Sequence, residues 1–140
     1  HYRPLHGIVI PEDQIPLAID EFPAIFIAAS CAEGETLLRG AAELRVKESD
    51  RIEAMATGLT TLGIESETFE DGIRITGGQL SGGEVDSRGD HRIAMAFTIA
   101  GLQAAATITV NNCANVATSF PGFVDLTRQA GLRLTERAVS

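Results

Sequence analysis

Residues 43–51 gather acidic and basic side chains immediately before a predicted helix. Lys47, Glu48 and Arg51 fall on one side of a helical turn, because residues three and four positions apart are neighbours there. A helix N-terminus favours anions through its unpaired N–H groups and its dipole. These three side chains could therefore hold a small anion and move a proton on it. The alternative is a solvated helix face whose ion pairs add only some tenths of a kcal/mol.

Three other predicted helix starts also carry polar residues, namely Asp20, residues 90–92, and the pair Thr118 and Ser119. In a repeated fold, equivalent helix starts lie at one end of the domain, so we expect these residues to form one polar rim. Asp20 and Asp90 could instead be plain N-caps, each contributing about 0.5–2 kcal/mol. Arg92 directly precedes an apolar stretch, where a charge is less easily explained as surface.

The chain contains an internal repeat of about seventy residues. Residues 20–40 and 90–110 each open with Asp and continue as an Ala-rich apolar segment, which predicts a buried helix followed by a strand. A second helix is predicted in each copy, over residues 49–62 and 118–130, and a glycine follows each one as a stop.

Strands are predicted at residues 6–10, 64–68, 72–76 and 132–135, and the middle two form a hairpin. The glycine-rich residues 77–89 predict the longest loop. Helices alternating with strands indicate an α/β fold with helices packed against sheets. We expect the whole chain, residues 1–140, to form one domain.

Composition excludes some classes of protein. The apolar content of 44% is that of an ordinary globular protein, and the net charge of −8 argues against nucleic acid or an anionic membrane as partner. No apolar stretch reaches about 18 residues, so no transmembrane helix is expected. Without a recognisable signal peptide, we expect a cytoplasmic location. Cys31 and Cys113 are expected to be reduced and buried, and no zinc, P-loop or dinucleotide motif is found.

Three motifs match one family in order and spacing: residues 43–51 (ELRVKESDR), 90–95 (DHRIAM) and 117–121 (ATSFP). Together they closely resemble the EPSP synthases, or 3-phosphoshikimate 1-carboxyvinyltransferases, over nearly the whole chain. The resemblance implies a two-domain enzyme built from βαβαββ units, three per domain, with the active site between the domains. The two repeats look like the last two units of the C-terminal half, so we expect a C-terminal fragment of such an enzyme.

The resemblance also implies a reaction. The family transfers the enolpyruvyl group of phosphoenolpyruvate to the 5-hydroxyl of shikimate 3-phosphate and releases phosphate, on the route to chorismate and the aromatic amino acids. The reaction passes through a tetrahedral ketal phosphate and uses no metal and no organic cofactor. It needs a base, an acid and cations around the phosphate and carboxylate groups. The implied partners are these two substrates and the missing N-terminal half, in a monomeric enzyme.

Five residues take on roles through this resemblance. Asp20 matches the aspartate that contacts shikimate 3-phosphate and accepts a proton. Glu48 matches the glutamate that exchanges protons with the methylene carbon of phosphoenolpyruvate, and Lys47 matches the lysine that reaches the target hydroxyl. Arg51 and Arg92 match the two arginines that bind phosphoenolpyruvate, whose carboxylate suits their planar forks.

Two positions depart from the family pattern. Glu43 stands where some members carry an Asn that touches the shikimate substrate. Thr118 stands where some members carry a Lys at the phosphoenolpyruvate site, so binding of that substrate or of the inhibitor glyphosate could be weaker. Glu43 and Thr118 are therefore secondary candidates.

The family's Lys-Ser pair, its other arginines and its Ser-Ser-Gln segment belong to an earlier part of the protein, so we predict that this chain alone is inactive. Two alternatives stay open. One is the sister enolpyruvyl transferase that acts on UDP-N-acetylglucosamine, although the motifs at residues 47–51 and 90–92 are not expected there. The other is a non-catalytic binding module of the same fold.

Overall fold

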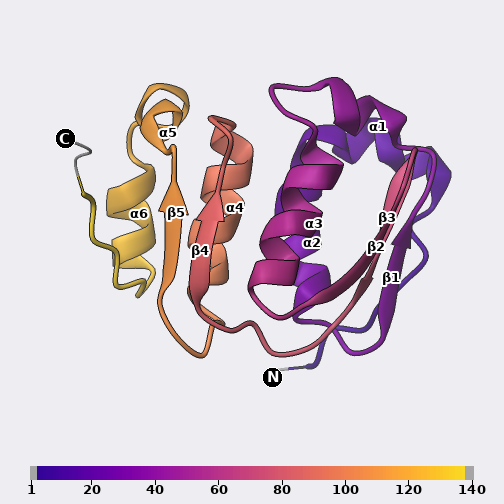
Figure 1. The fold of residues 1–140 in the computed structure, drawn as a ribbon, viewed down its shortest axis with the longest axis horizontal. Coiled ribbons are helices and arrows are strands. Elements are labelled where there is room, and N and C mark those ends of the chain that lie inside the picture. The colour runs from indigo at the N-terminus through magenta and orange to yellow at the C-terminus, as the bar shows by residue number, and fades with distance from the viewer. Residues whose placement is uncertain (1–2, 138–140) are drawn as a thin grey trace.

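The computed structural model describes residues 3–137 and contains two sheets (Figure 1). The first sheet is antiparallel, in the order β1-β3-β2, and comprises β1 (Glu35–Leu38), β3 (Gly72–Thr76) and β2 (Glu65–Phe69). The second sheet pairs β4 (Gly83–Asp86) in parallel with β5 (Ile108–Asn111). The predicted hairpin is confirmed, with Ile73 paired to Thr68 on one side and to Leu38 on the other.

The helices are α1 (Ile15–Ala18), α2 (Phe22–Ser30), α3 (Arg51–Thr61), α4 (His91–Ala100), α5 (Ala114–Ser119) and α6 (Phe123–Gln129), with 3-10 turns at Glu12–Gln14, Ile19–Glu21 and Ala42–Val46. Three of the helices, α2, α3 and α4, lie between the two sheets, and α6 lies on the outer side of the second sheet (Figure 1). Figure 1 shows α2 and α3 against the three-stranded sheet, with α4 between them and the second sheet. The predicted α/β fold with helices packed on sheets is confirmed. No helix within the described residues is long and apolar enough to cross a membrane.

The repeat appears in the structure as two parallel crossovers, each joining an extended segment through a helix to a strand. The first extended segment, residues 6–10, forms isolated bridges rather than the full predicted strand. Residues 6–10 run parallel to β1, through bridges at His6 and Val9 and a hydrogen bond of 2.9 Å from Leu37 N to Ile8 O. β4 pairs with β5 in the same way, and α4 connects these two strands as α2 connects the first pair. Residues 77–89 are therefore not all loop as predicted, because Gly83–Asp86 within them form β4, the counterpart of residues 6–10.

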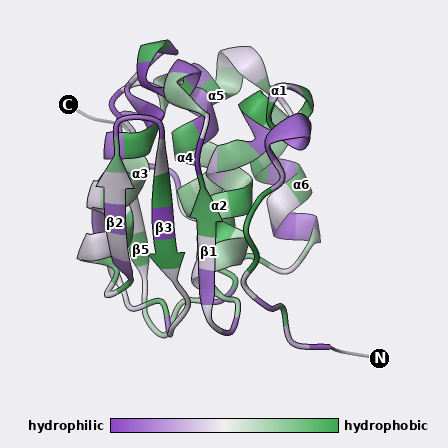
Figure 2. Ribbon diagram, turned by 90° about the vertical axis from the view of Figure 1, so that its right-hand side faces the viewer, coloured by the Kyte–Doolittle hydropathy of each residue, from purple (hydrophilic) through white to green (hydrophobic). Residues whose placement is uncertain are grey.

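One apolar core joins both repeats. Phe22 and Phe26 of α2 stack with ring centroids 5.8 Å apart, and both are buried with Ile75 of β3 and Phe97 of α4. Alternation along β3 sends Ile73 and Ile75 inward, and Figure 2 shows the more polar residues of β2 beside them. The two cysteines are free thiols, as predicted, but each is only half-buried.

The second repeat departs from the prediction near its end. The predicted helix over residues 118–130 is confirmed only in its later part, where α6 covers Phe123–Gln129 and the predicted stop, Gly131, follows with a φ of 103°. Its start is wrong, since Thr118 and Ser119 end α5. Pro121 explains the break, because proline lacks an N–H and drives the residue before it out of the helical region. The predicted strand at residues 132–135 is also wrong, and there the Leu134 carbonyl accepts hydrogen bonds from the Arg128 side chain.

Helix limits in the first repeat are close to prediction. α3 starts at Arg51 rather than Ser49, because Asp50 is its N-cap and accepts a hydrogen bond of 3.0 Å from Glu53 N. Its predicted stop is confirmed at Gly63, whose φ of 85° belongs to the left-handed region that glycine adopts readily. Asp20 does not cap α2, because it lies within the preceding 3-10 turn.

The contact between α3 and α4 gives a direct test of this packing. A methyl group at Gly58 would lie 2.2 Å from Cζ of the fully buried Phe97 ring. We expect Gly58→Ala to lower the free energy of unfolding by about 1–2 kcal/mol despite the better helix propensity of alanine. Urea denaturation measures this change. The control is Gly78→Ala, where the added methyl makes ordinary contact with Ile64, and equal effects in the two variants would contradict the packing.

Candidate functional site

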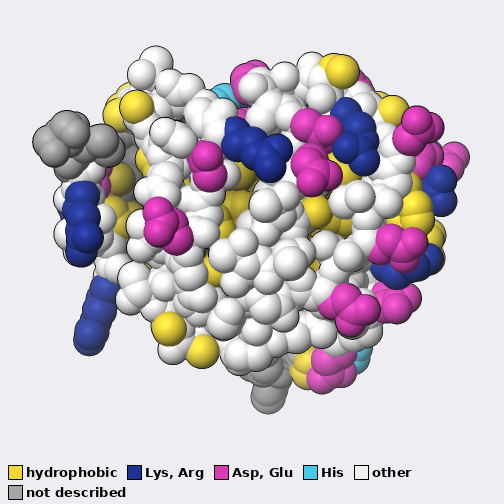
Figure 3. All heavy atoms as spheres, in the orientation of Figure 1, with side chains coloured by type: hydrophobic (Ala, Val, Ile, Leu, Met, Phe, Trp, Pro, Cys, Tyr) yellow, Lys and Arg dark blue, Asp and Glu magenta, His cyan; other side chains and the backbone are white. Residues whose placement is uncertain are grey.

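The first residues of α2, α3 and α4 lie at the same end of the molecule, as the repeat predicted (Figure 1). Figure 3 shows acidic and basic side chains intermixed along this upper part of the face. Four of the predicted residues, Asp20, Lys47, Glu48 and Arg51, form one connected set of ion pairs. Lys47 and Glu48 precede α3 instead of lying on it, so their convergence comes from the loop before the helix.

Arg51 is the centre of this set. Its side chain is 1% exposed and donates to three carboxylates: Asp90 at 2.9 Å from Nε, Glu48 at 2.6 Å and Asp20 at 3.2 Å. A buried guanidinium is tolerated only when its charge is paired and its N–H groups are bonded. The alternative of a solvated helix face is therefore wrong for Arg51.

Asp90 is the partner that anchors Arg51. Its side chain is 0% exposed and accepts hydrogen bonds from Arg51, from Ser49 Oγ at 2.8 Å and from Arg92 N at 3.0 Å. Burial alone would raise the pKa of this carboxyl, but the hydrogen bonds from Arg51 and Ser49 outweigh it and hold the pKa below its ordinary value. Asp90 is thus the predicted N-cap of α4 and also the counter-ion of Arg51 in α3.

Lys47 holds the outer carboxylates together. Its Nζ lies 3.0 Å from Glu43 Oε1 and 3.6 Å from Asp20 Oδ1. Partial burial would raise the pKa of Asp20, but Lys47, Arg92 and Arg51 outweigh this and lower the pKa from its ordinary value. Asp20 is half-exposed, so this carboxylate is charged at neutral pH and open to a ligand.

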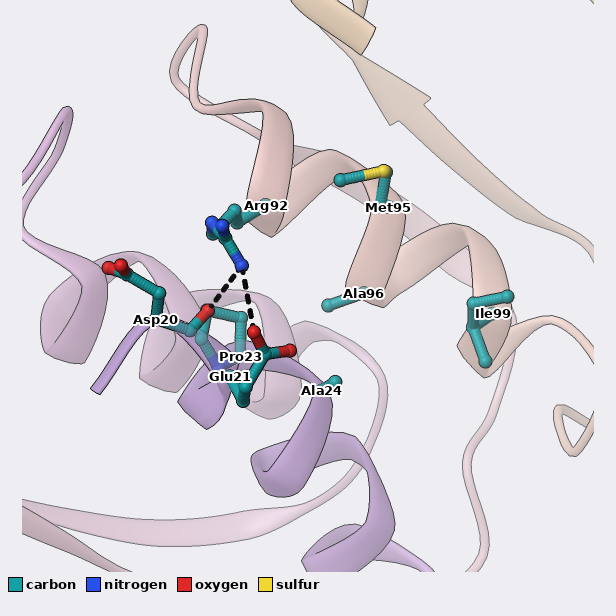
Figure 4. A pocket seen from close by; sticks show the side chains of 8 residues that line it. All are labelled: Asp20, Glu21, Pro23, Ala24, Arg92, Met95, Ala96 and Ile99. Atoms are coloured by element: carbon teal, nitrogen blue, oxygen red, sulfur yellow. Dashed lines mark hydrogen bonds and ion pairs between the residues drawn. The ribbon is translucent and has the colours of Figure 1, made fainter. Parts of the chain in front are cut away.

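Arg92 lies on the other side of Asp20 and is more accessible, with 34% of its side chain exposed. It donates to the Asp20 carbonyl at 2.9 Å and to Glu21 Oε1 at 3.3 Å, as Figure 4 shows. Below it a hollow runs between α2 and α4, lined by the apolar residues Pro23, Ala24, Met95, Ala96 and Ile99. An anion could replace Glu21 on Arg92 without disturbing the buried pair.

The structure does not bring every predicted residue into this set. Thr118 is exposed at the end of α5 and has no hydrogen bond to the arginines among the described residues. Glu43 is included through Lys47. Sequence reasoning missed the Ser49 and Glu21 contacts, and it placed Asp90 in the polar rim or as a helix cap without predicting that it pairs with Arg51. A partner 39 positions away in the chain leaves no local signal.

Chemically, this rim combines half-exposed carboxylates, which can take or give protons, with an accessible cation at Arg92. The carboxylates of Asp20 and Glu48 both touch Arg51, so one buried charge orients both. Within residues 3–137, no group of His, Cys, Asp and Glu side chains is arranged to hold a metal ion. The arrangement therefore suits acid–base chemistry on an anionic small molecule.

Comparisons with known proteins agree on one family. The model for EPSP synthase (3-phosphoshikimate 1-carboxyvinyltransferase) matches residues 3–126. The chain is 67% identical over 131 residues to the 3-phosphoshikimate 1-carboxyvinyltransferase of Methylococcus capsulatus, covering 94% of this chain and 30% of that protein. A solved EPSP synthase from Acinetobacter baumannii matches with a TM-score of 0.90 and 58% identity, over 92% of this chain and 31% of that one. The chain thus spans about a third of the length of these relatives.

The buried pair predicts a large effect on stability. Asp90→Ala should lower the free energy of unfolding by about 3–5 kcal/mol, because it removes the α4 cap and the only fully buried counter-ion that Arg51 has among the described residues, which leaves it the more exposed Glu48 and Asp20. Asp90→Asn keeps an acceptor for the α4 cap and should cost less. Urea denaturation compares both with Glu67→Ala, which breaks only the exposed pair with Arg74. An effect of Asp90→Ala no larger than that of Glu67→Ala would refute the anchoring role.

The same carboxylates predict a dependence of stability on pH. Both Asp90 and Asp20 have pKa values below the ordinary 3.8. Because the folded-state pKa is the lower one, the stabilisation is complete above the unfolded pKa and is lost as the pH falls through the folded pKa. We expect the urea midpoint to drop as the pH falls below about 4. Asp90→Asn should flatten this dependence, whereas the control Asp125→Asn in α6 should leave it unchanged.

Proposed function

The chain belongs to the EPSP synthase family, and we propose that it forms one wall of the active site of a 3-phosphoshikimate 1-carboxyvinyltransferase. The reaction would transfer the enolpyruvyl group of phosphoenolpyruvate to the 5-hydroxyl of shikimate 3-phosphate. The observation that carries this proposal is the convergence of Asp20, Lys47 and Glu48 around the buried Arg51. A proton acceptor, a cation and a second carboxylate thereby lie within reach of one ligand.

Asp20 is proposed to accept the proton of the 5-hydroxyl. In the free chain, Lys47, Arg92 and Arg51 keep its pKa low, which makes it a weak base. Anionic substrates that bind Lys47 and Arg92 would neutralise these cations and raise the pKa of Asp20. Binding of both substrates would therefore strengthen the base at the moment it is needed.

Glu48 is proposed to exchange a proton with the methylene carbon of phosphoenolpyruvate. Its carboxylate is more than half exposed, and the hydrogen bond of 2.6 Å from Arg51 orients it. The methylene carbon gains a proton during addition and loses one during elimination, so the same group can serve both steps. Lys47, which now bridges Glu43 and Asp20, is proposed to release Glu43 and bind the substrate hydroxyl.

The two arginines are proposed to share phosphoenolpyruvate unequally. Arg92 is partly exposed and needs only to exchange Glu21 for the substrate carboxylate. Arg51 is 1% exposed, and a substrate could contact it only after Glu48 or Asp20 shifts. Arg92 would therefore meet the ligand first, and Arg51 would complete the site. Thr118 stays a secondary candidate.

The excess of carboxylates over cations in this part of the site indicates that further cationic residues from elsewhere in the enzyme are needed to bind the substrates. Five carboxylates surround three cations here, namely Asp20, Glu21, Glu43, Glu48 and Asp90 around Lys47, Arg51 and Arg92. Two substrates that each carry phosphate and carboxylate groups require an excess of cations. We propose that residues 1–140 are a C-terminal portion of a two-domain enzyme and that the rest of this enzyme supplies the missing cations. The isolated chain is therefore proposed to be inactive. That the enzyme is monomeric and cytoplasmic stays a prediction.

A chimera tests this function directly. The matching 131 residues of the Methylococcus capsulatus enzyme are replaced by those of this chain, which are 67% identical. The chimera should retain the release of phosphate from phosphoenolpyruvate in the presence of shikimate 3-phosphate. The 140-residue chain alone should show no such release. A correctly folded chimera without activity would refute the proposed function, and turnover by the isolated chain would refute the need for further walls.

Variants of the chimera test the separate roles. Asp20→Asn and Glu48→Gln should each lower kcat by about 10²–10⁴-fold, because each removes a proton-transfer group. Circular dichroism and the thermal midpoint check that the variants stay folded. Glu53→Gln is the matched control, since Glu53 is exposed in the first turn of α3. A kcat within about twofold of the control in either variant would remove that residue from the proposed mechanism.

A further inference from the structure

The loop that carries Lys47 and Glu48 is held by side chains. In the part of the chain that the structure describes, residues 47–49 make no backbone–backbone hydrogen bond, although regular elements flank them on both sides. Nor does apolar packing hold the loop at its start, because Val46 is 79% exposed. The loop is therefore held by side-chain contacts, which include those of Lys47, Glu48 and Ser49 with Asp20, Arg51 and Asp90. The side chains at its two ends set where its backbone lies.

Arg45 is the side chain at the first end. Its guanidinium donates in three directions: from Nε to the Glu70 carbonyl at 2.9 Å, from one terminal nitrogen to the Phe69 carbonyl, and from the other to Asp50 Oδ2 at 2.9 Å. The two carbonyls belong to the end of β2 and the turn toward β3. The planar fork thus ties the loop to the sheet, and a lysine could not reproduce all three directions.

Asp50 is the side chain at the second end. One of its oxygens accepts from Arg45 and the other accepts from Glu53 N at 3.0 Å, which caps α3. Arg45 consequently closes residues 46–49 into a short loop whose two ends meet at a single ion pair. Because α3 begins at the next residue, Arg51, the same clamp also fixes the loop relative to the buried arginine.

We propose that Arg45 is a positioning residue that sets where Lys47 and Glu48 stand relative to Asp20. The inference rests on the proposed function for its catalytic consequence, but its structural part stands without it. Arg45 itself does not touch the carboxylates of Asp20 or Glu48. It acts through the loop, and a displacement of about 1 Å in a catalytic group is enough to cost as much as 10²-fold in rate.

The first test measures rates in the chimera. Arg45→Ala and Arg45→Lys should lower kcat by about 10- to 100-fold. Arg39→Ala is the matched control, because Arg39 also contacts the hairpin, bonding Asp71 at 2.7 Å and covering the Phe69 ring. Within residues 3–137, it makes no hydrogen bond or ion pair with residues 46–50. Its kcat should stay within about twofold. If Arg45→Ala does not fold, Arg45→Lys, which keeps the charge, decides the outcome.

The second test needs no activity. In the 140-residue chain, the carboxyl of Asp20 is titrated by NMR; it faces Lys47 from the loop, Arg51 from α3, Arg92 from α4, and the adjacent Glu21. Release of the loop should move Lys47 away and raise the pKa of Asp20 in both Arg45 variants but not in Arg39→Ala. A merely structural Arg45 would lower the thermal midpoint and leave this titration unmoved.

The two tests separate the two proposals. If the chimera is inactive but the Asp20 pKa rises in the Arg45 variants of the 140-residue chain, the proposed function is refuted and the positioning role is supported. If the chimera is active but its Arg45 variants match Arg39→Ala in kcat, or the Asp20 pKa does not move in the Arg45 variants of the 140-residue chain, the positioning role is overturned and the function stays intact.

Discussion

The arrangement of this end of the molecule depends on one buried ion pair, between Arg51 of α3 and Asp90 at the start of α4. Among the described residues, Asp90 has no other cationic side chain bonded to its carboxylate, and Asp90 is the only fully buried carboxylate of the three that Arg51 contacts, so loss of either charge is costly. Each partner also has a second duty, because Arg51 orients Asp20 and Glu48 while Asp90 caps the helix that carries Arg92. Because the two repeats pack together through this pair, the pair fixes the distance between the proposed proton-transfer groups, Asp20 and Glu48, and the accessible cation, Arg92.

Around this fixed centre the charges become progressively more exposed and more exchangeable. The side chains of Arg51 and Asp90 are buried and that of Lys47 is mostly buried, whereas those of Glu21, Glu43 and Glu48 are exposed to solvent. Outer pairs of this kind contribute little to stability because water screens them. They can therefore be replaced by ligand groups at low cost, whereas the inner pair keeps its geometry. The buried ion pair thus gives rigid support, and the contacts that a ligand can replace lie at the surface.

Local patterns in the sequence predicted the elements whose causes are local. The Asp90 cap, the Gly63 stop and the hairpin at Gly72 all follow from the preferences of neighbouring residues. The repeat further predicted that the helix starts meet at one end. The misses have non-local or competing causes: β4 forms only because β5 pairs with it, and Pro121 overrides the helical spacing around it. The dual role of Asp90 was invisible because its partner is distant in the chain.

The double duty of Asp90 constrains how such a sequence can change. Within the described part of the chain, replacing Arg51 alone leaves Asp90 buried without a cation, and replacing Asp90 alone leaves Arg51 with only the more exposed carboxylates of Glu48 and Asp20, so a route to a different pair passes through a destabilised intermediate. Substitutions at Glu21 or Glu43 meet no such barrier, since both side chains are exposed. Evolutionary drift and laboratory selection should therefore alter ligand preference through the outer carboxylates long before they alter the inner pair.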